Sequence, residues 1–285
     1  MIGGLPEEFE FFKMSGAGND FILIDNRRGP LREEDLPELA LKLCRRQQGI
    51  GADGLILLAA STRASLKMIY HNADGSRGEL CGNGARCAAR LAYMRVMAGK
   101  RMTLETDSGL LRAEVMDGGM VRVQMPQPEG ARENLEFDIG EKVLTGQYVR
   151  VGVPHVVIYT QDVEQVPVER WGRLLRQHEN LAPEGANIHF VQRVGAGWRQ
   201  RSYERGVEAE TLACGSGAVA TAYFAARLFG QKGPAHLAVR SGALLEVHYE
   251  GVTEPHTFEL QGETRLICRG KITPEAFWGP KAGEP

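Results

Sequence analysis

Two short stretches of this chain repeat each other, and each begins with a cysteine. The first is Cys81-Gly82-Asn83-Gly84-Ala85 and the second is Cys214-Gly215-Ser216-Gly217-Ala218. Each opens a segment rich in alanine, and a helix that is small and apolar all round is buried on every side. The glycines permit close approach of other groups at each helix start. The repeat therefore predicts two related halves, each with a thiol at the start of a central helix.

The rest of the chain predicts many short strands and few helices. Segments of alternating apolar residues are separated by turn residues such as Asp117-Gly118-Gly119, which is typical of hairpins. We expect long helices over 82–98 and 215–229, and shorter helical segments at 37–46 and 174–179. The fold class is therefore α/β (α+β), with two pseudo-symmetric domains, each a curved and mostly antiparallel sheet wrapped around a central helix.

The expected domain boundaries follow the repeat. The first half covers 1–127, the second covers 128–263, and a closing strand with a loose tail covers 264–285. The polar segment from Pro126 to Asn134 contains two prolines, and we interpret it as the linker.

Composition narrows the class of protein. The 285 residues are 43% hydrophobic and 25% charged, as in a soluble globular protein. A net charge of -2 argues against a nucleic-acid partner, which needs a basic field. No apolar run could span a bilayer, and no secretory signal is visible at the N-terminus. Five cysteines without metal-type CxxC pairs favour a reduced, cytoplasmic protein with no metal site.

A cysteine at a helix start has a defined chemistry. The helix dipole and free N–H groups lower the pKa of a thiol, and the same N–H groups bind a carboxylate. Two such sites acting on opposite faces of one carbon could invert a stereocentre by proton transfer. The alternatives are small core cysteines, which we expect for Cys44, Cys87 and Cys268, and a redox or disulfide pair.

Several polar residues end strands near these loops. Asn19, Asn72 and Asn187 could orient ammonium and carboxylate groups, and Glu204-Arg205 precedes the second thiol. The alternative is that the asparagines make turns and that Glu204 and Arg205 form surface ion pairs. His155 is either a hydrogen-bonded structural residue or a group that tunes a nearby thiol.

These motifs, in this order, resemble the diaminopimelate epimerase family from about Phe9 to Ile272. Proline racemases share the fold and the two thiols, but their thiol motifs differ. The stretches that carry the resemblance are Ser15-Gly16-Ala17-Gly18-Asn19-Asp20-Phe21, Asn72-Ala73-Asp74-Gly75-Ser76, Cys81-Gly82-Asn83-Gly84-Ala85-Arg86-Cys87, Tyr203-Glu204-Arg205-Gly206 and Ala213-Cys214-Gly215-Ser216-Gly217.

The resemblance implies an isomerase that needs no cofactor, neither pyridoxal phosphate nor a metal. It would convert LL-2,6-diaminoheptanedioate into the meso form in lysine biosynthesis, as a cytoplasmic homodimer whose C-terminal strand returns to the first domain. The implied catalytic residues are Cys81 and Cys214, which exchange the roles of proton donor and acceptor. The implied substrate-binding residues are Asn19, Asn72, Gly82, Asn83, Asn187, Glu204, Arg205, Gly215 and Ser216, and His155 and Glu204 would modulate the thiol pKa values.

Two positions depart from the family pattern. Val153 stands where many members have asparagine, and Gly54 stands where some have glutamine. Two other functions remain open on the sequence: a related cofactor-independent racemase, for proline or another amino acid, and a non-catalytic protein that binds amino acids.

Overall fold

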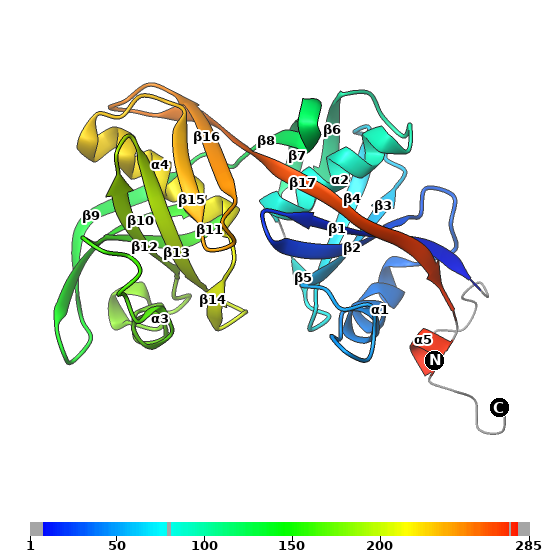
Figure 1. Cartoon of the computed structure of the whole chain (residues 1–285), viewed down its shortest axis with the longest axis horizontal. Coiled ribbons are helices and arrows are strands. Elements are labelled where there is room, and N and C mark those ends of the chain that lie inside the picture. Colours follow the sequence, from blue (N-terminus) through cyan, green and yellow to red (C-terminus); the bar gives the residue numbers. More distant parts are fainter. Residues whose placement is uncertain (1–7, 79–80, 274, 279–285) are drawn as a thin grey trace. The chain divides into compact units, whose positions relative to one another are not determined.

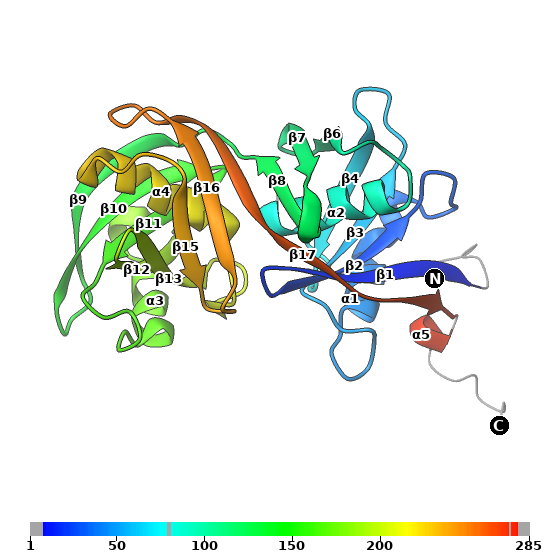
Figure 2. The ribbon, with the colours of Figure 1, turned by 45° about the horizontal axis from the view of Figure 1, so that its top comes forward.

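The computed structural model describes residues 8–78, 81–273 and 275–278 (Figures 1 and 2). The chain divides into two compact units. Unit 1 comprises Met1–Val121 and Thr264–Pro285, and unit 2 comprises Arg122–Glu263. The division after Val121 lies a few residues before the boundary that the sequence suggested, at 127.

Unit 1 is a mostly antiparallel sheet around helix α2. Strand β2 pairs with β1 in antiparallel fashion and with β3 in parallel, and β3 pairs antiparallel with β4. Strands β6 and β7 form a further antiparallel pair. The elements are β1 (Phe9–Gly16), β2 (Asn19–Asp25), α1 (Leu36–Leu43), β3 (Gly54–Ala59), β4 (Leu66–Asn72), β5 (Arg77–Gly78), α2 (Gly82–Met94), β6 (Arg101–Thr106), β7 (Gly109–Val115), β8 (Met120–Gln124, which runs into unit 2) and α5 (Glu275–Trp278).

Unit 2 repeats this plan around helix α4, which Figure 1 shows in yellow. Strand β12 pairs in parallel with β11 and antiparallel with β13, as β3 does with β2 and β4. The elements are β9 (Glu129–Asp138), β10 (Val143–Val151), β11 (Val153–Tyr159), α3 (Val168–Arg176), β12 (Asn187–Val194), β13 (Gly197–Glu204), β14 (Ala209–Thr211), α4 (Gly215–Phe229), β15 (Ala235–Val239) and β16 (Leu244–Glu250).

The C-terminal strand β17 (His256–Ile272) belongs to both units. Its first part pairs antiparallel with β16 in unit 2. From Thr264 onward it pairs antiparallel with β1 in unit 1, as far as Ile272 opposite Phe9. Three short 3-10 turns complete the described elements, at Glu33–Asp35, Asp117–Gly119 and Glu179–Leu181.

The two central helices lie where the sequence predicts them. Helix α2 begins at Gly82 and α4 begins at Gly215, each directly after its cysteine. Nearly all of the α4 residues up to Ala226 are buried, and the same is true of α2 up to Ala92. Alanine and glycine at these positions let the surrounding strands approach the helix closely, because large side chains would hold them apart.

Two expectations are wrong. The segment interpreted as a linker contains the start of β9, which pairs with β10 through Arg132 opposite Tyr148. The β9 residues within that segment, up to Asn134, are exposed, so a strand there has the polar composition of a loop. Cys268 is exposed on β17 and is not a core residue, whereas Cys44 and Cys87 are buried as expected. Burial raises the pKa of both buried thiols to about 12.

Within the described residues, no helix has the length and apolar character needed to cross a membrane.

Candidate active site

Cys81 caps the N-terminus of α2 in unit 1. Its backbone is extended, with φ -130° and ψ 107°, and its sulfur accepts a hydrogen bond from the N–H of Gly84 at 3.4 Å. The thiol donates to Oδ1 of Asn19 at 3.7 Å, and Nδ2 of Asn83 donates to the same oxygen at 3.3 Å. The structure thus brings together three residues that the sequence analysis selected.

The approach of Asn19 to the thiol depends on Gly16, at the end of β1. A Cβ atom at Gly16 would lie 2.8 Å from the carbonyl oxygen of Asn83 and 3.3 Å from Sγ of Cys87. Only glycine therefore allows the turn between β1 and β2 to pack against the first turns of α2.

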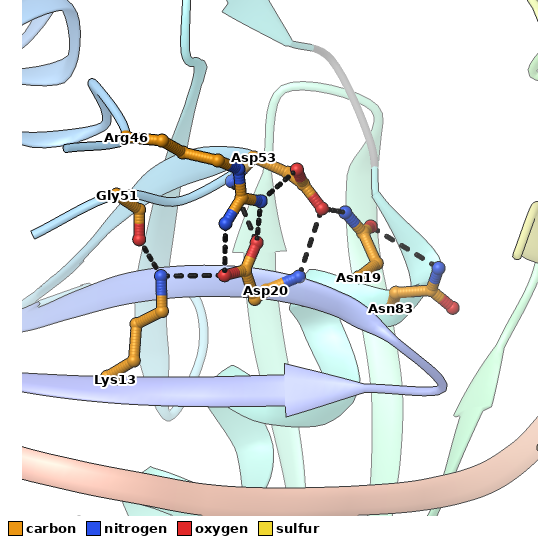
Figure 3. A network of polar contacts seen from close by, with 7 residues as sticks. All are labelled: Lys13, Asn19, Asp20, Arg46, Gly51, Asp53 and Asn83. Carbon is orange, nitrogen blue, oxygen red and sulfur yellow. Dashed lines mark hydrogen bonds and ion pairs between the residues drawn. The ribbon is translucent and has the colours of Figure 1, made fainter. Parts of the chain in front are cut away.

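A network of charged residues holds Asn19 in place (Figure 3). Nδ2 of Asn19 donates to Asp53 Oδ2 at 2.6 Å, and the backbone N–H of Asp20 donates to the same oxygen at 3.1 Å. Arg46 contacts Asp20 at 2.8 Å and Asp53 at 2.9 Å, and Nζ of Lys13 lies 2.7 Å from Asp20. Sequence reasoning missed this network, because nothing in the residue types showed that separate loops would meet.

The charge balance of the network centres on Asp20. Burial alone would raise the pKa of this carboxyl group, but hydrogen bonds and charges from Arg46 and Lys13 outweigh burial and lower it. Asp20 is therefore ionised at neutral pH and compensates the buried ammonium group of Lys13.

Asn72 is bound within its own hairpin. Its Oδ1 accepts from the hydroxyl of Tyr70 at 2.6 Å, and its Nδ2 donates to Ser76 at 2.9 Å. It lies opposite Gly54 in the β3–β4 register. A Cβ atom at Gly54 would be 2.5 Å from the Tyr70 ring, so packing of this ring explains why the chain has no side chain at that position.

Cys214 caps α4 in unit 2 in the same extended conformation, with φ -114° and ψ 109°. Its sulfur lies 3.8 Å from the hydroxyl of Ser216, and the residue is only 4% exposed. Burial raises the pKa of this thiol well above its ordinary value, and the negative charge of Glu204 raises it further. The N–H of Gly217 and the hydroxyl of Ser216 act in the opposite direction. The expected lowering by the helix start is therefore outweighed at Cys214.

His155 lies beside Cys214 and is fully buried on β11. One nitrogen of its ring, one of the His189 ring and Sγ of Cys214 lie within 4.8 Å of one another. Burial lowers the pKa of His155 to about 3, so the imidazole is neutral at neutral pH. His189 is a residue that the sequence analysis did not select, and its only signal was one polar residue in an apolar strand.

Asn187 and Arg205 are joined by a hydrogen bond. The backbone N–H of Arg205 donates to Oδ1 of Asn187 at 2.7 Å, which holds the end of β13 against the start of β12. The Arg205 guanidinium group is partly exposed and lies 3.9 Å from the carboxylate of Glu184. The ion pair considered from the sequence is therefore present but long, and Nη1 of Arg205 also donates to the backbone carbonyl of Glu184 at 3.4 Å. Val153 begins β11 and contributes no polar side chain there.

Each thiol is followed by the backbone N–H groups of the first turn of its helix. Gly82 and Asn83 are the first two residues of α2, and Gly215 and Ser216 are the first two of α4. The N–H groups of a first helical turn have no partner inside the helix and favour an anion. Each unit thus combines a thiol with a carboxylate-binding helix start.

The chain matches the sequence model of the family described as diaminopimelate epimerase over residues 11–129 and 147–264. It is 38% identical over 277 residues to the diaminopimelate epimerase of Hydrogenobaculum sp., covering 93% of this chain and 99% of that protein. It is 39% identical over 281 residues to the diaminopimelate epimerase of Aquifex aeolicus, covering 94% and 99%.

Solved structures show the same fold at low sequence identity. A probable proline racemase from Agrobacterium radiobacter aligns with a TM-score of 0.73 and 18% identity, covering 96% of this chain and 99% of that one. A phenazine biosynthesis protein of the PhzF family from Bacillus anthracis aligns with a TM-score of 0.72 and 16% identity, covering 94% and 99%. At this level of identity the similarity concerns the fold alone.

Removing the charge of Asp20 should destabilise the protein. Asp20→Asn leaves the ammonium group of Lys13 buried without its counter-charge, which costs about 3 kcal/mol when such a pair is broken. Because the folded-state pKa of Asp20 is lowered, its contribution is complete above its unfolded value and is lost as the pH falls through the folded value. Urea unfolding should therefore show a loss in the free energy of unfolding, relative to the parent, that is full at neutral pH and shrinks in acid.

Asp25→Asn, in an exposed pair with Arg27, is the control and should cost at most about 1 kcal/mol. An equal loss in both variants would contradict this account.

Removing the charge of Glu204 should lower the pKa of Cys214. The carboxylate opposes formation of the thiolate, so Glu204→Gln should shift the titration of Cys214 downward by about one pH unit. NMR of protein with isotope-labelled cysteine Cβ measures this titration, and the signal of Cys214 is assigned by its loss in Cys214→Ala. Glu133→Gln, which removes a carboxylate paired with Arg227, is the matched control. An unchanged or upward shift in Glu204→Gln would show that another group sets the pKa.

Proposed function

Because the chain belongs to the diaminopimelate epimerase family, we propose that it interconverts LL- and meso-2,6-diaminoheptanedioate through the two thiols Cys81 and Cys214. The epimerase activity, that of an isomerase, follows from membership in the family. The observation that supports the two-thiol mechanism is the duplication: each unit has a cysteine at the N-cap of a buried central helix.

The proton transfer needs one thiolate and one thiol. The thiolate removes the α-proton from one face of the substrate, and the electron pair of the broken C–H bond moves into the adjacent carboxylate. The other thiol then donates its proton to the opposite face of Cα and becomes the thiolate. One proton leaves and one enters, so the reverse reaction uses the same two sulfurs with exchanged roles. No electron acceptor or cofactor takes part in this scheme.

The helix starts supply the stabilisation of the intermediate. As the α-proton leaves, negative charge accumulates on the reacting carboxylate. The N–H groups of Gly82, Asn83, Gly215 and Ser216 would donate to this carboxylate. Donors aimed at a charge that grows during the reaction lower the barrier, because they bind the transition state more strongly than the substrate.

The remaining polar groups would hold the distal end of the substrate. Diaminoheptanedioate carries a second carboxylate and a second ammonium group, and a site for it needs both cationic and anionic partners. Arg205 suits the carboxylate and Glu204 suits an ammonium group. The amides of Asn19, Asn72 and Asn187 would complete the set.

His155 and Glu204 would adjust the protonation of Cys214. The structure gives Cys214 a raised pKa, which suits the thiol that begins as proton donor. Glu204 opposes the thiolate, whereas a neutral imidazole can donate a hydrogen bond to it. The balance between these two neighbours would set how readily Cys214 gives up its proton.

We place the enzyme in lysine biosynthesis through diaminopimelate, in the cytoplasm, where thiols stay reduced. The five cysteines are free in the structure, which is compatible with that setting. We further propose that the protein works as a homodimer.

Replacing either catalytic thiol should abolish epimerisation. Cys81→Ala and Cys214→Ala each remove a proton-transfer group, and such groups contribute about 10²–10⁴-fold to the rate. Chiral separation of the LL and meso forms measures the reaction. Cys87→Ala and Cys268→Ala are matched controls, because one removes a buried thiol of α2 and the other an exposed thiol of β17.

Near-full activity in Cys81→Ala or Cys214→Ala would refute the two-thiol mechanism. Binding of diaminoheptanedioate by the parent protein without any epimerisation, with both thiols reduced, would instead indicate a non-catalytic binder.

A further inference from the structure

A chain of buried polar side chains leads away from the Cys214 site into unit 2. The hydroxyl of Thr221 donates to Oε1 of Gln200 at 2.8 Å, and Nε2 of Gln200 donates to Oγ of Ser202 at 3.1 Å. Oγ of Ser202 lies 2.8 Å from Nδ1 of His189, and Nε2 of His189 lies 2.8 Å from Nδ1 of His155. Each of these residues is at most 2% exposed. We call them the Cys214 relay.

The equivalent positions in unit 1 are almost entirely apolar. The strand registers align β2, β3 and β4 with β11, β12 and β13, because Phe21 pairs with Gly54 where His155 pairs with Asn187. Likewise Ile56 pairs with Tyr70 where His189 pairs with Ser202. By these registers and the repeated thiol loops, the counterparts of His155, His189, Gln200 and Thr221 are Phe21, Ile56, Met68 and Ala88.

The polar side chains of the relay carry a cost of burial that the apolar residues of unit 1 do not. Buried polar groups lose their hydration, and only a full set of hydrogen bonds compensates for that loss. Unit 1 shows that the same scaffold closes around its central helix with apolar side chains at these positions. The scaffold therefore does not require polar groups at these positions, and the end of the relay beside Cys214 points to a role at that thiol.

His189 also contacts the first turn of α4 directly. A Cβ atom at Gly217 would lie 2.2 Å from Cε1 of His189 and 2.6 Å from its Nε2. In unit 1, a Cβ atom at Gly84 would instead meet Cδ1 of Ile56 at 2.8 Å. The glycine of the repeated motif thus makes room for a neighbouring side chain in both units, but only in unit 2 is that side chain an imidazole.

One direction of donation through the relay assigns the ring protons. In that direction, Ser202 accepts from Gln200 and its own hydroxyl donates to Nδ1 of His189. A neutral His189 that accepts at Nδ1 carries its proton on Nε2 and donates to Nδ1 of His155. A neutral His155 that accepts at Nδ1 carries its proton on Nε2. Burial lowers the pKa of both rings, so both are neutral at neutral pH.

The last nitrogen of the relay, Nε2 of His155, is buried and makes no hydrogen bond within the described residues. The other three ring nitrogens of the two histidines are occupied. One nitrogen of each imidazole and Sγ of Cys214 lie within 4.8 Å of one another, so the unpaired Nε2 belongs to a ring that lies beside the sulfur.

We propose that His189, held by Ser202, is a positioning residue that keeps the proton of His155 on Nε2 and so directs a hydrogen-bond donor at Cys214. The arrangement makes the two thiols chemically unequal, because unit 1 has no imidazole at either equivalent position. Its importance for turnover rests on the proposed function, whereas its effect on the free protein does not.

The other groups around Cys214 also act on the equilibrium between its thiol and its thiolate. Glu204 opposes the thiolate, while Ser216 and the N–H of Gly217 favour it. The charges of Arg205 and Arg150, together with burial, keep His155 neutral, and the carbonyl of Val151 acts against them. A donor at Nε2 of His155 therefore adds to Ser216 and Gly217 and offsets part of the effect of Glu204.

The cluster of His155, His189 and Cys214 also has the residue types of a metal site. Both nitrogens of His189 are occupied by hydrogen bonds to His155 and Ser202, however, and Nδ1 of His155 is occupied as well. A metal ion would have to break the relay to gain a second imidazole ligand. The hydrogen bonds therefore favour a relay over a metal centre.

The test uses the full-length, unliganded protein with a chelator present. Nitrogen NMR of labelled histidine reports which ring nitrogen carries the proton, and NMR of labelled cysteine Cβ reports the titration of each thiol. In the parent we expect the Nε2–H form of His155. In His189→Ile, which installs the residue of the equivalent unit 1 position, the titration of Cys214 should shift upward by about one pH unit, because one hydrogen bond to a charged sulfur is lost.

Three further variants separate positioning from simple packing. Ser202→Ala removes only the hydroxyl that orients His189 and should shift Cys214 in the same direction. His189→Gln retains a donor and an acceptor and should restore part of the shift. His236→Gln alters another histidine of unit 2, on β15, and should leave Cys214 unchanged. Cys81 should titrate as in the parent in all four variants.

An Nδ1–H form of His155 in the parent would overturn the proposal. So would an unchanged titration of Cys214 in Ser202→Ala and His189→Ile when circular dichroism shows both to be folded. These measurements need no substrate, so a failure of the relay and a failure of the epimerase mechanism are separate results.

Discussion

The burial of two central helices rich in small residues is the constraint on which this structure depends. Glycine and alanine make up nearly half of α2 and of α4, which lets the curved sheets approach both helices closely. The same enclosure removes water from the cysteine at the start of α4. For Cys214 burial and the charge of Glu204 outweigh the helix start, and the pKa of the thiol is raised. Packing and acid–base chemistry are thus set by the same residues.

The two units share a scaffold but surround their thiols differently. Cys81 contacts the amide of Asn19, which a network of Asp53, Asp20 and Arg46 holds in place. Cys214 has instead a carboxylate and an imidazole as neighbours. A reaction in which the two sulfurs exchange roles needs one of them protonated when the other is not. Unequal surroundings provide a physical basis for that division.

The sequence was sufficient to predict those elements whose signal lies within a short stretch of residues. The repeated Cys-Gly motifs and the alanine content were sufficient to locate α2 and α4, because helix starts and small buried faces leave a local signal. The exposed strand β9 was missed, since its polar residues are typical of a loop. The contact of Asn19 with Asp53 and the pairing of His155 with His189 were missed for another reason. Both join strands or loops whose proximity is decided by strand register, which a single sequence does not encode locally.

The most direct test of the two-thiol mechanism is the fate of solvent deuterium during early turnover. Reduced protein is incubated with LL-2,6-diaminoheptanedioate in deuterium oxide without added cofactor, and the two epimers are separated and analysed by mass. Two separate thiols predict a meso product with one deuterium at the inverted carbon, while the remaining LL substrate stays unlabelled. Deuterium appearing in the LL substrate as fast as in the product would mean that one group removes and returns the proton, and would contradict the account.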